Sequence, residues 1–224
     1  MTKRITVLIS GRGTNLAALL AAMKDGALGG AITRVVANVH GAAGLAIADA
    51  QGVATATVNH RMFASRDDFD AALVQEIDSG RPDLVVLAGF MRVLGTAFVR
   101  HYADRLINIH PSLLPLYPGL HTHRRALEGG VRIHGCTVHF VTPEVDVGPI
   151  IAQAAVPVRD DDDEASLSER VLAQEHLLLP AAVRWFCEGR LVIEGRRVRV
   201  NGVPHSADAA ALRVPADQIA EHRP

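Results

Sequence analysis

Residues 106–115 read Leu106-Ile107-Asn108-Ile109-His110-Pro111-Ser112-Leu113-Leu114-Pro115. The apolar start of this stretch predicts a buried strand, and the prolines that follow predict a turn directly after it. Alternate strand residues point to the same face, so the side chains of Asn108 and His110 can reach one spot together. That spot lies past the carboxyl end of a strand, where open α/β sheets bind their ligands.

Asn108 and His110 carry two groups that acyl transfer uses. An amide N–H can donate to a developing oxyanion, and an imidazole can move a proton near neutral pH. The same pair also fits a polar strand end that is closed by a turn and has no catalytic role. The rest of the chain is needed to decide between these two interpretations.

Strands and helices alternate on the N-terminal side of this stretch. Apolar runs predict strands, and stripes at helical spacing predict helices between them. This alternation predicts an α/β fold with a doubly wound, mainly parallel sheet. The predicted strands are 4–9, 31–37, 54–58, 84–88 and 106–110, and the predicted helices are 15–24, 44–51, 65–78 and 95–102.

The pattern changes after Leu120. A short helix is predicted at 123–128, and the strands 136–141 and 150–158 are expected to pair as an antiparallel extension of the sheet. A long helix follows over 164–189 and contains Pro180, where we expect a disturbance. A hairpin is predicted over 190–201. We therefore expect a single domain over residues 1–200, and a polar, disordered tail over 201–224.

Composition narrows the function classes. The chain has 224 residues, 49% of them hydrophobic, so it is long enough to bury a substantial core. Its formal net charge is −1, which argues against a nucleic-acid partner. No apolar run reaches the roughly 18–20 residues of a membrane span, and residues 1–10 lack a signal-peptide pattern. Cys136 and Cys187 have no metal-ligand spacing and predict reduced thiols in the cytoplasm.

A glycine-containing segment follows the first predicted strand and opens the first predicted helix. It reads Ser10-Gly11-Arg12-Gly13-Thr14-Asn15. Glycines allow close backbone approach to a ligand, and a helix N-terminus offers free amide donors to a phosphate. Leu16 breaks the dinucleotide fingerprint, and the Walker spacing is absent, so one phosphate fits better than a pyrophosphate. An ordinary tight turn with Thr14 as the helix N-cap explains the segment equally well.

Two carboxylates stand out by their positions. Asp146 lies in a polar loop between two predicted strands, where most carboxylates are solvated turn formers. Its functional interpretation is that it faces His110, holds the imidazole and favours the protonated form. Glu175 continues the stripe of Leu167 and Val171 on the long helix. It is therefore either an edge residue or a partly buried acid that binds an amine or hydroxyls.

We predict no metal site. His121 and His123 invite a metal interpretation, but no third ligand has a convincing spacing. The acidic run from Asp160 to Glu164 fits a solvated lead-in to the long helix, favoured by the helix dipole, better than a Mg²⁺ site.

Taken together, these motifs resemble the phosphoribosylglycinamide formyltransferase family, the folate-dependent transformylases of purine synthesis. The shared segments follow the family's order and cover about residues 4–195. The strand-end motif is shared with other formyl-folate enzymes, whereas residues 117–123 are more specific to this family. The matching segments are Ile9-Ser10-Gly11-Arg12-Gly13-Thr14-Asn15, Leu87-Ala88-Gly89-Phe90-Met91-Arg92, Asn108-Ile109-His110-Pro111-Ser112-Leu113-Leu114-Pro115, Tyr117-Pro118-Gly119-Leu120-His121-Thr122-His123 and Gln174-Glu175-His176.

The resemblance implies a formyltransferase-like Rossmann variant whose N-terminal part binds the phosphate of glycinamide ribonucleotide and whose C-terminal part binds 10-formyltetrahydrofolate, a co-substrate. Glycinamide would accept the formyl group on its amine. The implied catalytic residues are Asn108, His110 and Asp146. The implied ribonucleotide-binding residues are Gly13, Thr14, Asn15 and Glu175. The implied folate-binding residues are Arg66, Met91, Arg92, Val93, Leu94, Asn108, Thr142, Pro143, Glu144, Val145 and Asp146.

Two positions depart from the family pattern. The family often has glycine where this chain has Val147, and a β-branched residue does not readily adopt φ > 0. We therefore expect the loop around Asp146 to be set differently. The family often has a polar residue at the position of Leu172, so one contact to the ribonucleotide is expected to be missing here.

The main alternative is a formyltetrahydrofolate deformylase, which passes the formyl group to water and carries an additional N-terminal regulatory domain. Methionyl-tRNA formyltransferases need a further C-terminal domain, and this chain is short for one and not basic. A binding protein without catalysis is expected to lack His110 or Asp146. We therefore expect a cytoplasmic purine-synthesis enzyme, monomeric or homodimeric, with small-molecule substrates and no nucleic-acid or membrane partner.

Overall fold

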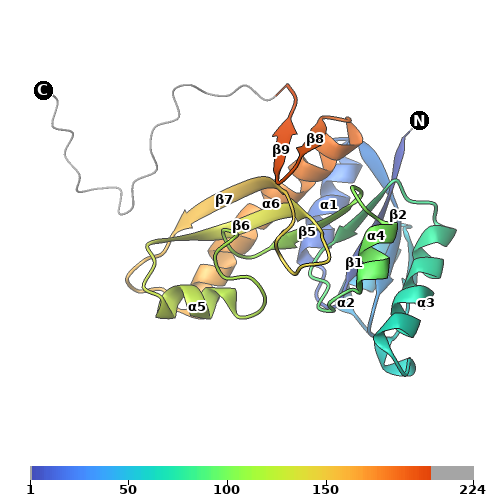
Figure 1. The fold of residues 1–224 in the computed structure, drawn as a ribbon, viewed down its shortest axis with the longest axis horizontal. Coiled ribbons are helices and arrows are strands. Elements are labelled where there is room, and N and C mark those ends of the chain that lie inside the picture. Colours follow the sequence, from blue (N-terminus) through green and yellow to red (C-terminus); the bar gives the residue numbers. More distant parts are fainter. Residues whose placement is uncertain (1, 203–224) are drawn as a thin grey trace, which may run out of the picture.

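The computed structural model describes residues 2–202. A mixed sheet of nine strands forms its centre, in the order β3-β2-β1-β4-β5-β6-β7-β9-β8 (Figure 1). The strands are β1 Lys3–Ile9, β2 Gly30–Ala37, β3 Ala54–Thr57, β4 Leu84–Leu87, β5 Leu106–His110, β6 Ile133–Phe140, β7 Ile150–Pro157, β8 Leu191–Glu194 and β9 Arg197–Val200. The helices are α1 Thr14–Lys24, α2 Ala43–Asp49, α3 Arg66–Ser79, α4 Thr96–His101, α5 Thr122–Glu128 and α6 Glu164–Cys187, with a short 3₁₀ helix η1 at His60–Met62.

The first five strands form the predicted parallel part of the sheet. β1 pairs in parallel with β2 and β4, and β4 pairs in parallel with β5. Both faces are buried, so β1 needs apolar residues on both sides: Ile5 and Val7 pack into one core and Leu8 into the other. This double burial explains the near-continuous apolar runs of the sequence.

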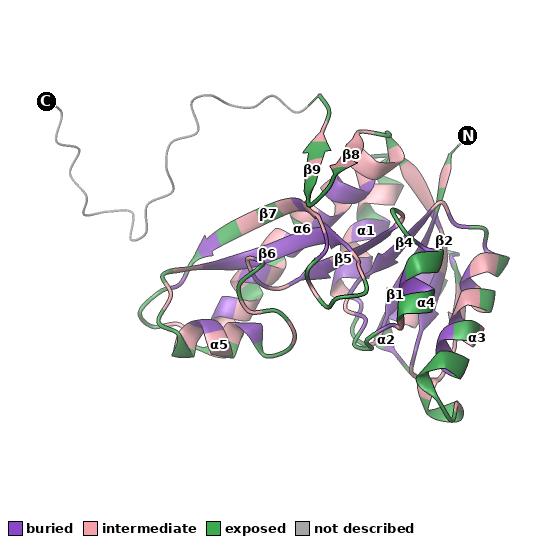
Figure 2. Cartoon of the chain, viewed as in Figure 1, coloured by how far each residue is buried: buried purple, intermediate pink, exposed green. Residues whose placement is uncertain are grey.

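Helices cover both faces of the sheet. Side chains of α1, α2 and α6 pack into the larger core, and those of α3 and α4 pack into the smaller core on the opposite face. The central strands β1, β4 and β5 are largely buried, whereas β8, β9 and the outward surfaces of the helices are partly or fully exposed (Figure 2). The predicted doubly wound α/β fold is confirmed.

Antiparallel strands extend the sheet beyond β5. β6 pairs antiparallel with β5 and with β7, and β8 and β9 form the predicted hairpin. β9 joins the edge of β7 through one parallel pair, Ile150 with Arg197. The predicted antiparallel extension is therefore confirmed, although β6 begins three residues earlier than the strand that the sequence predicts.

α3 begins and ends as the sequence predicts, whereas α6 differs from the prediction inside the helix. Ser65 caps α3 as predicted, because its hydroxyl accepts the Asp68 N–H at 3.1 Å, and Gly80 follows the end of the helix. α6 continues through Pro180, so the disturbance expected there does not break the helix. Buried Leu179 and Val183 hold the turns on either side of the proline in the core.

Two sequence predictions concern the limits of the chain and its relation to membranes. The disorder expected over 201–224 falls, from residue 203 on, outside the described residues. Within residues 2–202, no helix combines the length and the apolar content that a bilayer crossing requires.

Candidate active site

The site lies at the carboxyl edge of the parallel strands. The chain leaves β1 toward β2 on one side, whereas β4 and β5 lie on the other side, so strand order reverses between β1 and β4. Connections after these two strands diverge and leave a crevice, which is where open α/β sheets bind ligands. β5, β6 and the loops after β1, β4, β5 and β6 supply most of the residues described below.

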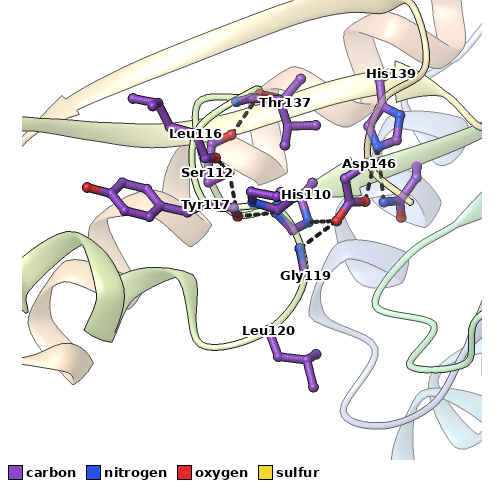
Figure 3. A network of polar contacts seen from close by, with 12 residues as sticks. His110, Ser112, Leu116, Tyr117, Gly119, Leu120, Thr137, His139 and Asp146 are labelled. Atoms are coloured by element: carbon purple, nitrogen blue, oxygen red, sulfur yellow. Dashed lines mark hydrogen bonds and ion pairs between the residues drawn. The ribbon is translucent and has the colours of Figure 1, made fainter. Parts of the chain in front are cut away.

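His110 ends β5 and is 6% exposed. Its Nε2 lies 2.9 Å from the carbonyl oxygen of Tyr117, and its Nδ1 lies 3.4 Å from Asp146 Oδ2 (Figure 3). Carbonyl and carboxylate oxygens accept hydrogen bonds only, so the imidazolium form, with a hydrogen on each nitrogen, satisfies both contacts. His110 is thus held between two acceptors beside the crevice.

Asp146 reaches His110 from the loop between β6 and β7. The backbone N–H of Gly119 donates to Asp146 Oδ2 at 2.8 Å, so the carboxylate joins two loops. Asp146 itself has φ 56°, whereas Val147 is not among the described residues with positive φ. The left-handed residue of this loop is therefore the aspartate, and Asp tolerates that conformation better than a β-branched side chain does.

Asn108 faces His139, a residue that the sequence analysis missed. The two residues pair across β5 and β6, and Asn108 Nδ2 lies 3.3 Å from His139 Nε2. His139 Nδ1 lies 2.9 Å from the carbonyl oxygen of Phe140, so Nδ1 carries the hydrogen and Nε2 accepts from the amide. Only the pairing register could have revealed this contact, because 31 residues separate the two side chains.

Burial keeps His139 neutral. Desolvation lowers the pKa of its imidazole, against smaller opposing effects of the Phe140 carbonyl and Asp146. The 3.7 Å approach of His139 Nε2 to Asp146 Oδ1 is therefore not a salt bridge. A neutral His139 fixes the Asn108 amide with its NH₂ group toward the ring, and the second hydrogen of that group stays free for another acceptor.

The turn after His110 is held by buried hydroxyls. Thr137 Oγ1 donates to the Ser112 carbonyl at 2.7 Å and accepts the Leu114 N–H at 3.0 Å. Ser112 Oγ donates to the Leu116 carbonyl at 2.6 Å. Both hydroxyl residues are fully buried, so this network fixes the segment whose Tyr117 carbonyl holds His110 (Figure 3).

A cavity of about 460 Å³ opens beside the three predicted catalytic residues, within the usual size range of small-molecule sites. Most of the predicted folate residues line it, but Arg66 and Glu144 are not among its lining residues. The predicted residues that do line it are Met91, Arg92, Val93, Leu94, Asn108, His110, Thr142, Pro143, Val145 and Asp146.

A second cavity of about 310 Å³ lies at the start of α1. Its walls include the predicted phosphate-binding residues Gly13, Thr14 and Asn15, and also Arg12, whose cation suits an anionic ligand. Gly13 occupies the N-cap position with φ 75°, so the alternative with Thr14 as N-cap is wrong. A Cβ on Gly13 would lie 2.6 Å from the Cα of Gly44, so the turn requires glycine for packing as well.

Glu175 lies inside the buried stripe of α6 and not at its edge. It is 7% exposed, and its Oε2 accepts the Asn15 Nδ2–H at 2.7 Å. Burial raises the pKa of the Glu175 carboxyl, against the lowering effect of Asn15. Glu175 is not among the residues that line the second cavity, but its partner Asn15 is.

His121 and His123, the two histidines considered as metal ligands, lie in different surroundings. His121 precedes α5 with φ 56°, while His123 Nδ1 lies 3.2 Å from Nε2 of buried His134. Burial, reinforced by His123, lowers the pKa of His134 to about 4. Among residues 2–202, no cluster of three or more His, Cys, Asp or Glu side chains has a metal-binding arrangement.

Comparisons with known proteins identify relatives of this chain. Residues 3–183 match the formyl transferase family model. The chain is 51% identical over 198 residues to phosphoribosylglycinamide formyltransferase of Escherichia coli K12, covering 88% of this chain and 93% of that protein. It is 49% identical over 193 residues to the trifunctional purine biosynthetic protein adenosine-3 of Drosophila melanogaster, covering 85% of this chain but 14% of that protein.

Solved structures give the same picture. Glycinamide ribonucleotide transformylase 1 from Symbiobacterium toebii superposes with a TM-score of 0.87 at 49% identity, covering 89% of this chain and 94% of that one. A formyltetrahydrofolate deformylase from Pseudomonas syringae pv. tomato superposes with a TM-score of 0.83 at 27% identity, covering 89% of this chain and 66% of that one. The deformylase is thus the more distant relative in sequence and has a longer chain.

Proposed function

Because this chain belongs to the phosphoribosylglycinamide formyltransferase family, we propose that it transfers the formyl group of 10-formyltetrahydrofolate to the amine of glycinamide ribonucleotide in purine biosynthesis. One observation carries the proposal: Asn108, His110 and Asp146 converge on a wall of one cavity. An amide donor, a protonated imidazole and a carboxylate that holds it are the groups that formyl transfer to an amine requires.

The ribonucleotide would occupy the second cavity. The first backbone amides of α1, at Gly13, Thr14 and Asn15, would donate to its phosphate, and the helix dipole favours that negative charge. Arg12 would add a cation from the same turn. Glu175 would serve the ribose hydroxyls from behind Asn15, because a buried carboxylate has further acceptor sites besides the one that the Asn15 amide uses.

Formyl-folate would occupy the larger cavity. Its apolar walls, including Met91, Val93 and Val145, suit a flat heterocycle, and the backbone of the loop 142–146 offers polar groups to the ring edge. Arg92 lines the cavity and suits an anionic tail. We keep Arg66 and Glu144 as proposed folate contacts, although neither lines the cavity. We assign these roles to one domain over residues 1–200.

The proposed reaction needs neither a metal nor a covalent enzyme intermediate. The amine nitrogen attacks the formyl carbon, and negative charge develops on the formyl oxygen. Asn108 Nδ2–H donates to this oxygen, a contribution of about 10²–10³ in rate. The positive charge of protonated His110, whose two N–H groups face Tyr117 and Asp146, stabilises the same oxygen through space. As the bond from the formyl carbon to N10 breaks, a proton leaves the new amide nitrogen and N10 takes one up, with His110 as the shuttle.

The assay that tests this function measures formyl-folate consumption with and without glycinamide ribonucleotide. We expect consumption only when the ribonucleotide is present, with formation of one formylated product per folate consumed. Consumption that is independent of the amine would identify a deformylase. Folate binding without any consumption would identify a binding protein, and either result would overturn the proposal.

We also propose the localisation, the partners and the oligomeric state of the enzyme. We propose that the enzyme acts in the cytoplasm, where free thiols such as those of Cys136 and Cys187 stay reduced. Its partners would be the two small-molecule substrates, with no part for nucleic acid or a membrane. We expect a monomer or a homodimer, and size-exclusion chromatography with light scattering distinguishes the two states.

A further inference from the structure

The two cavities meet at a bridge between the loops after β1 and β4. Ser10 directly follows β1, and its backbone N–H donates to the Gly89 carbonyl at 3.2 Å. Its hydroxyl oxygen accepts the backbone N–H of Met91 at 2.8 Å. This pair of bonds spans the point where strand order reverses, which is the point where the two loops otherwise diverge.

The Ser10 hydroxyl also donates its own hydrogen, to a residue that follows β2. This hydrogen is donated to Asn38 Oδ1 at 2.6 Å. Asn38 follows β2 and is 2% exposed. A further bond holds Asn38 in place, because its backbone carbonyl accepts the His60 N–H at 3.1 Å. A hydroxyl has one hydrogen, so Ser10 in this arrangement has none left to donate to a phosphate, although it lines the phosphate cavity.

Met91 forms part of the wall between the cavities. Gly89 and Met91 line both of them, and the following residues, Arg92 to Leu94, line only the larger one. The Met91 side chain is 65% exposed, so little packing holds this residue in place. The bond from its backbone N–H to Ser10 therefore helps to fix the start of the folate-lining segment.

We propose that Ser10 is a positioning residue that holds the folate-lining segment at Met91, and that it does not bind the phosphate itself. The chain of bonds runs from Asn38 through Ser10 to Met91 and joins the ends of β2, β1 and β4. Ser10 thus serves the folate site although its sequence neighbours, Gly13 to Asn15, serve the ribonucleotide. This role rests on the proposed assignment of the two cavities to the two substrates.

The bridge is testable without either substrate. In Ser10→Ala the Met91 amide loses its acceptor, so its hydrogen exchange, measured by NMR on the whole protein, should accelerate about tenfold or more. Ser10→Thr retains the hydroxyl and should keep the slow exchange. Ser79→Ala is the matched control: it removes a hydroxyl that bonds a backbone carbonyl at the exposed end of α3, and Ser79 lines neither cavity. Unchanged Met91 exchange in Ser10→Ala would overturn the bridge.

The role in substrate binding is tested by calorimetry with a stable 10-formyl-folate analogue and with glycinamide ribonucleotide. For Ser10→Ala we expect the folate-analogue Kd to rise about 3- to 10-fold, as for one lost hydrogen bond, and the ribonucleotide Kd to change less than twofold. A rise in the ribonucleotide Kd alone would make Ser10 a phosphate ligand and overturn the inference. An unchanged folate Kd would also overturn it.

Failure of this inference is distinguishable from failure of the proposed function. If the unaltered protein does not bind the folate analogue, the functional assignment fails, whatever the exchange at Met91. If it binds the analogue and Ser10→Ala binds it equally well, only the role of Ser10 fails. Recovery of both slow exchange and folate binding in Ser10→Thr would assign the effect to the hydroxyl.

Discussion

Asn108 and His139 face each other across the antiparallel pair of β5 and β6, with the amide nitrogen 3.3 Å from the ring Nε2. A primary amide presents either its oxygen or its NH₂ group to a neighbour, and only the NH₂ group can donate to an oxyanion. Because His139 is neutral and accepts at Nε2, it selects the orientation that catalysis needs.

We predict that His139→Leu lowers kcat by about 10- to 100-fold, because a misoriented donor loses much of its value for the transition state. KM for both substrates should stay within about twofold. His139→Gln, which can still offer an acceptor to Asn108, should recover part of the loss. Equal losses in His139→Leu and His139→Gln, together with raised KM, would instead indicate a role in packing.

Asp146→Asn should lower kcat by at least about 10²-fold with modest effects on substrate binding. An amide oxygen can still accept the Gly119 N–H, so the loop should keep its place. The negative charge beside His110 Nδ1 is lost, however, and the protonated imidazole loses its partner. Steady-state kinetics, with thermal unfolding as a control for the fold, measure the effect.

The pairing of Asp146 with His110 has a second signature in a double variant. Residues that act as one unit show non-additive losses. Asp146→Asn combined with His110→Ala should therefore be little slower than His110→Ala alone. Losses in kcat that multiply would show that the two residues act independently, even if each is important.

Arg12→Gln should test the phosphate site cleanly. Arg12 is exposed and lines the second cavity, so the change should raise KM for the ribonucleotide about 3- to 30-fold and leave the folate KM within twofold. The salt dependence of ribonucleotide binding should also weaken. Gly13→Val would not test the phosphate site cleanly, because a side chain there meets Gly44 and would be strained at φ 75°, so it would disturb the turn itself.

Glu175→Gln should weaken ribonucleotide binding about tenfold or more while leaving stability unchanged or higher at neutral pH. The raised pKa of Glu175 means that burial of the ionised form costs stability. That cost is absent below the unfolded pKa, near 4.3, and grows as pH rises through the folded pKa. Denaturant unfolding should therefore show Glu175→Gln gaining on the unaltered protein as pH rises. A large loss of stability with unchanged binding would mark Glu175 as purely structural.

His134 should make the fold sensitive to acid. Its folded pKa, about 4, lies below the unfolded value of about 6.5, so the stability linked to its neutral form is present above pH 6.5 and is lost as pH falls toward 4. His134→Gln cannot take up this proton. Between pH 6.5 and pH 4 the free energy of unfolding of this variant should therefore fall by roughly 1–3 kcal/mol less than that of the unaltered protein. Parallel pH profiles for the two proteins, from urea unfolding, would contradict this role for His134.

Local pattern determined much of this protein. Alternation along β5 places Asn108 and His110 on one face without any tertiary contact, and apolar runs between helical stripes predict the parallel sheet. The loop after β1 was predicted at the start of a helix. Each of these features depends on neighbours within a few residues in the chain, so the sequence alone contains the information.

Tertiary structure decided the features that join distant segments. The pairing of Asn108 with His139 follows from the β5–β6 register, and the bond from Met91 to Ser10 follows from β1 and β4 being neighbours. Glu175 continued an apolar stripe in the sequence, but only the packing of α6 against α1 placed it inside the core with Asn15 as its partner. Strand order and register are set by the collective burial of both sheet faces, and no single segment encodes that choice.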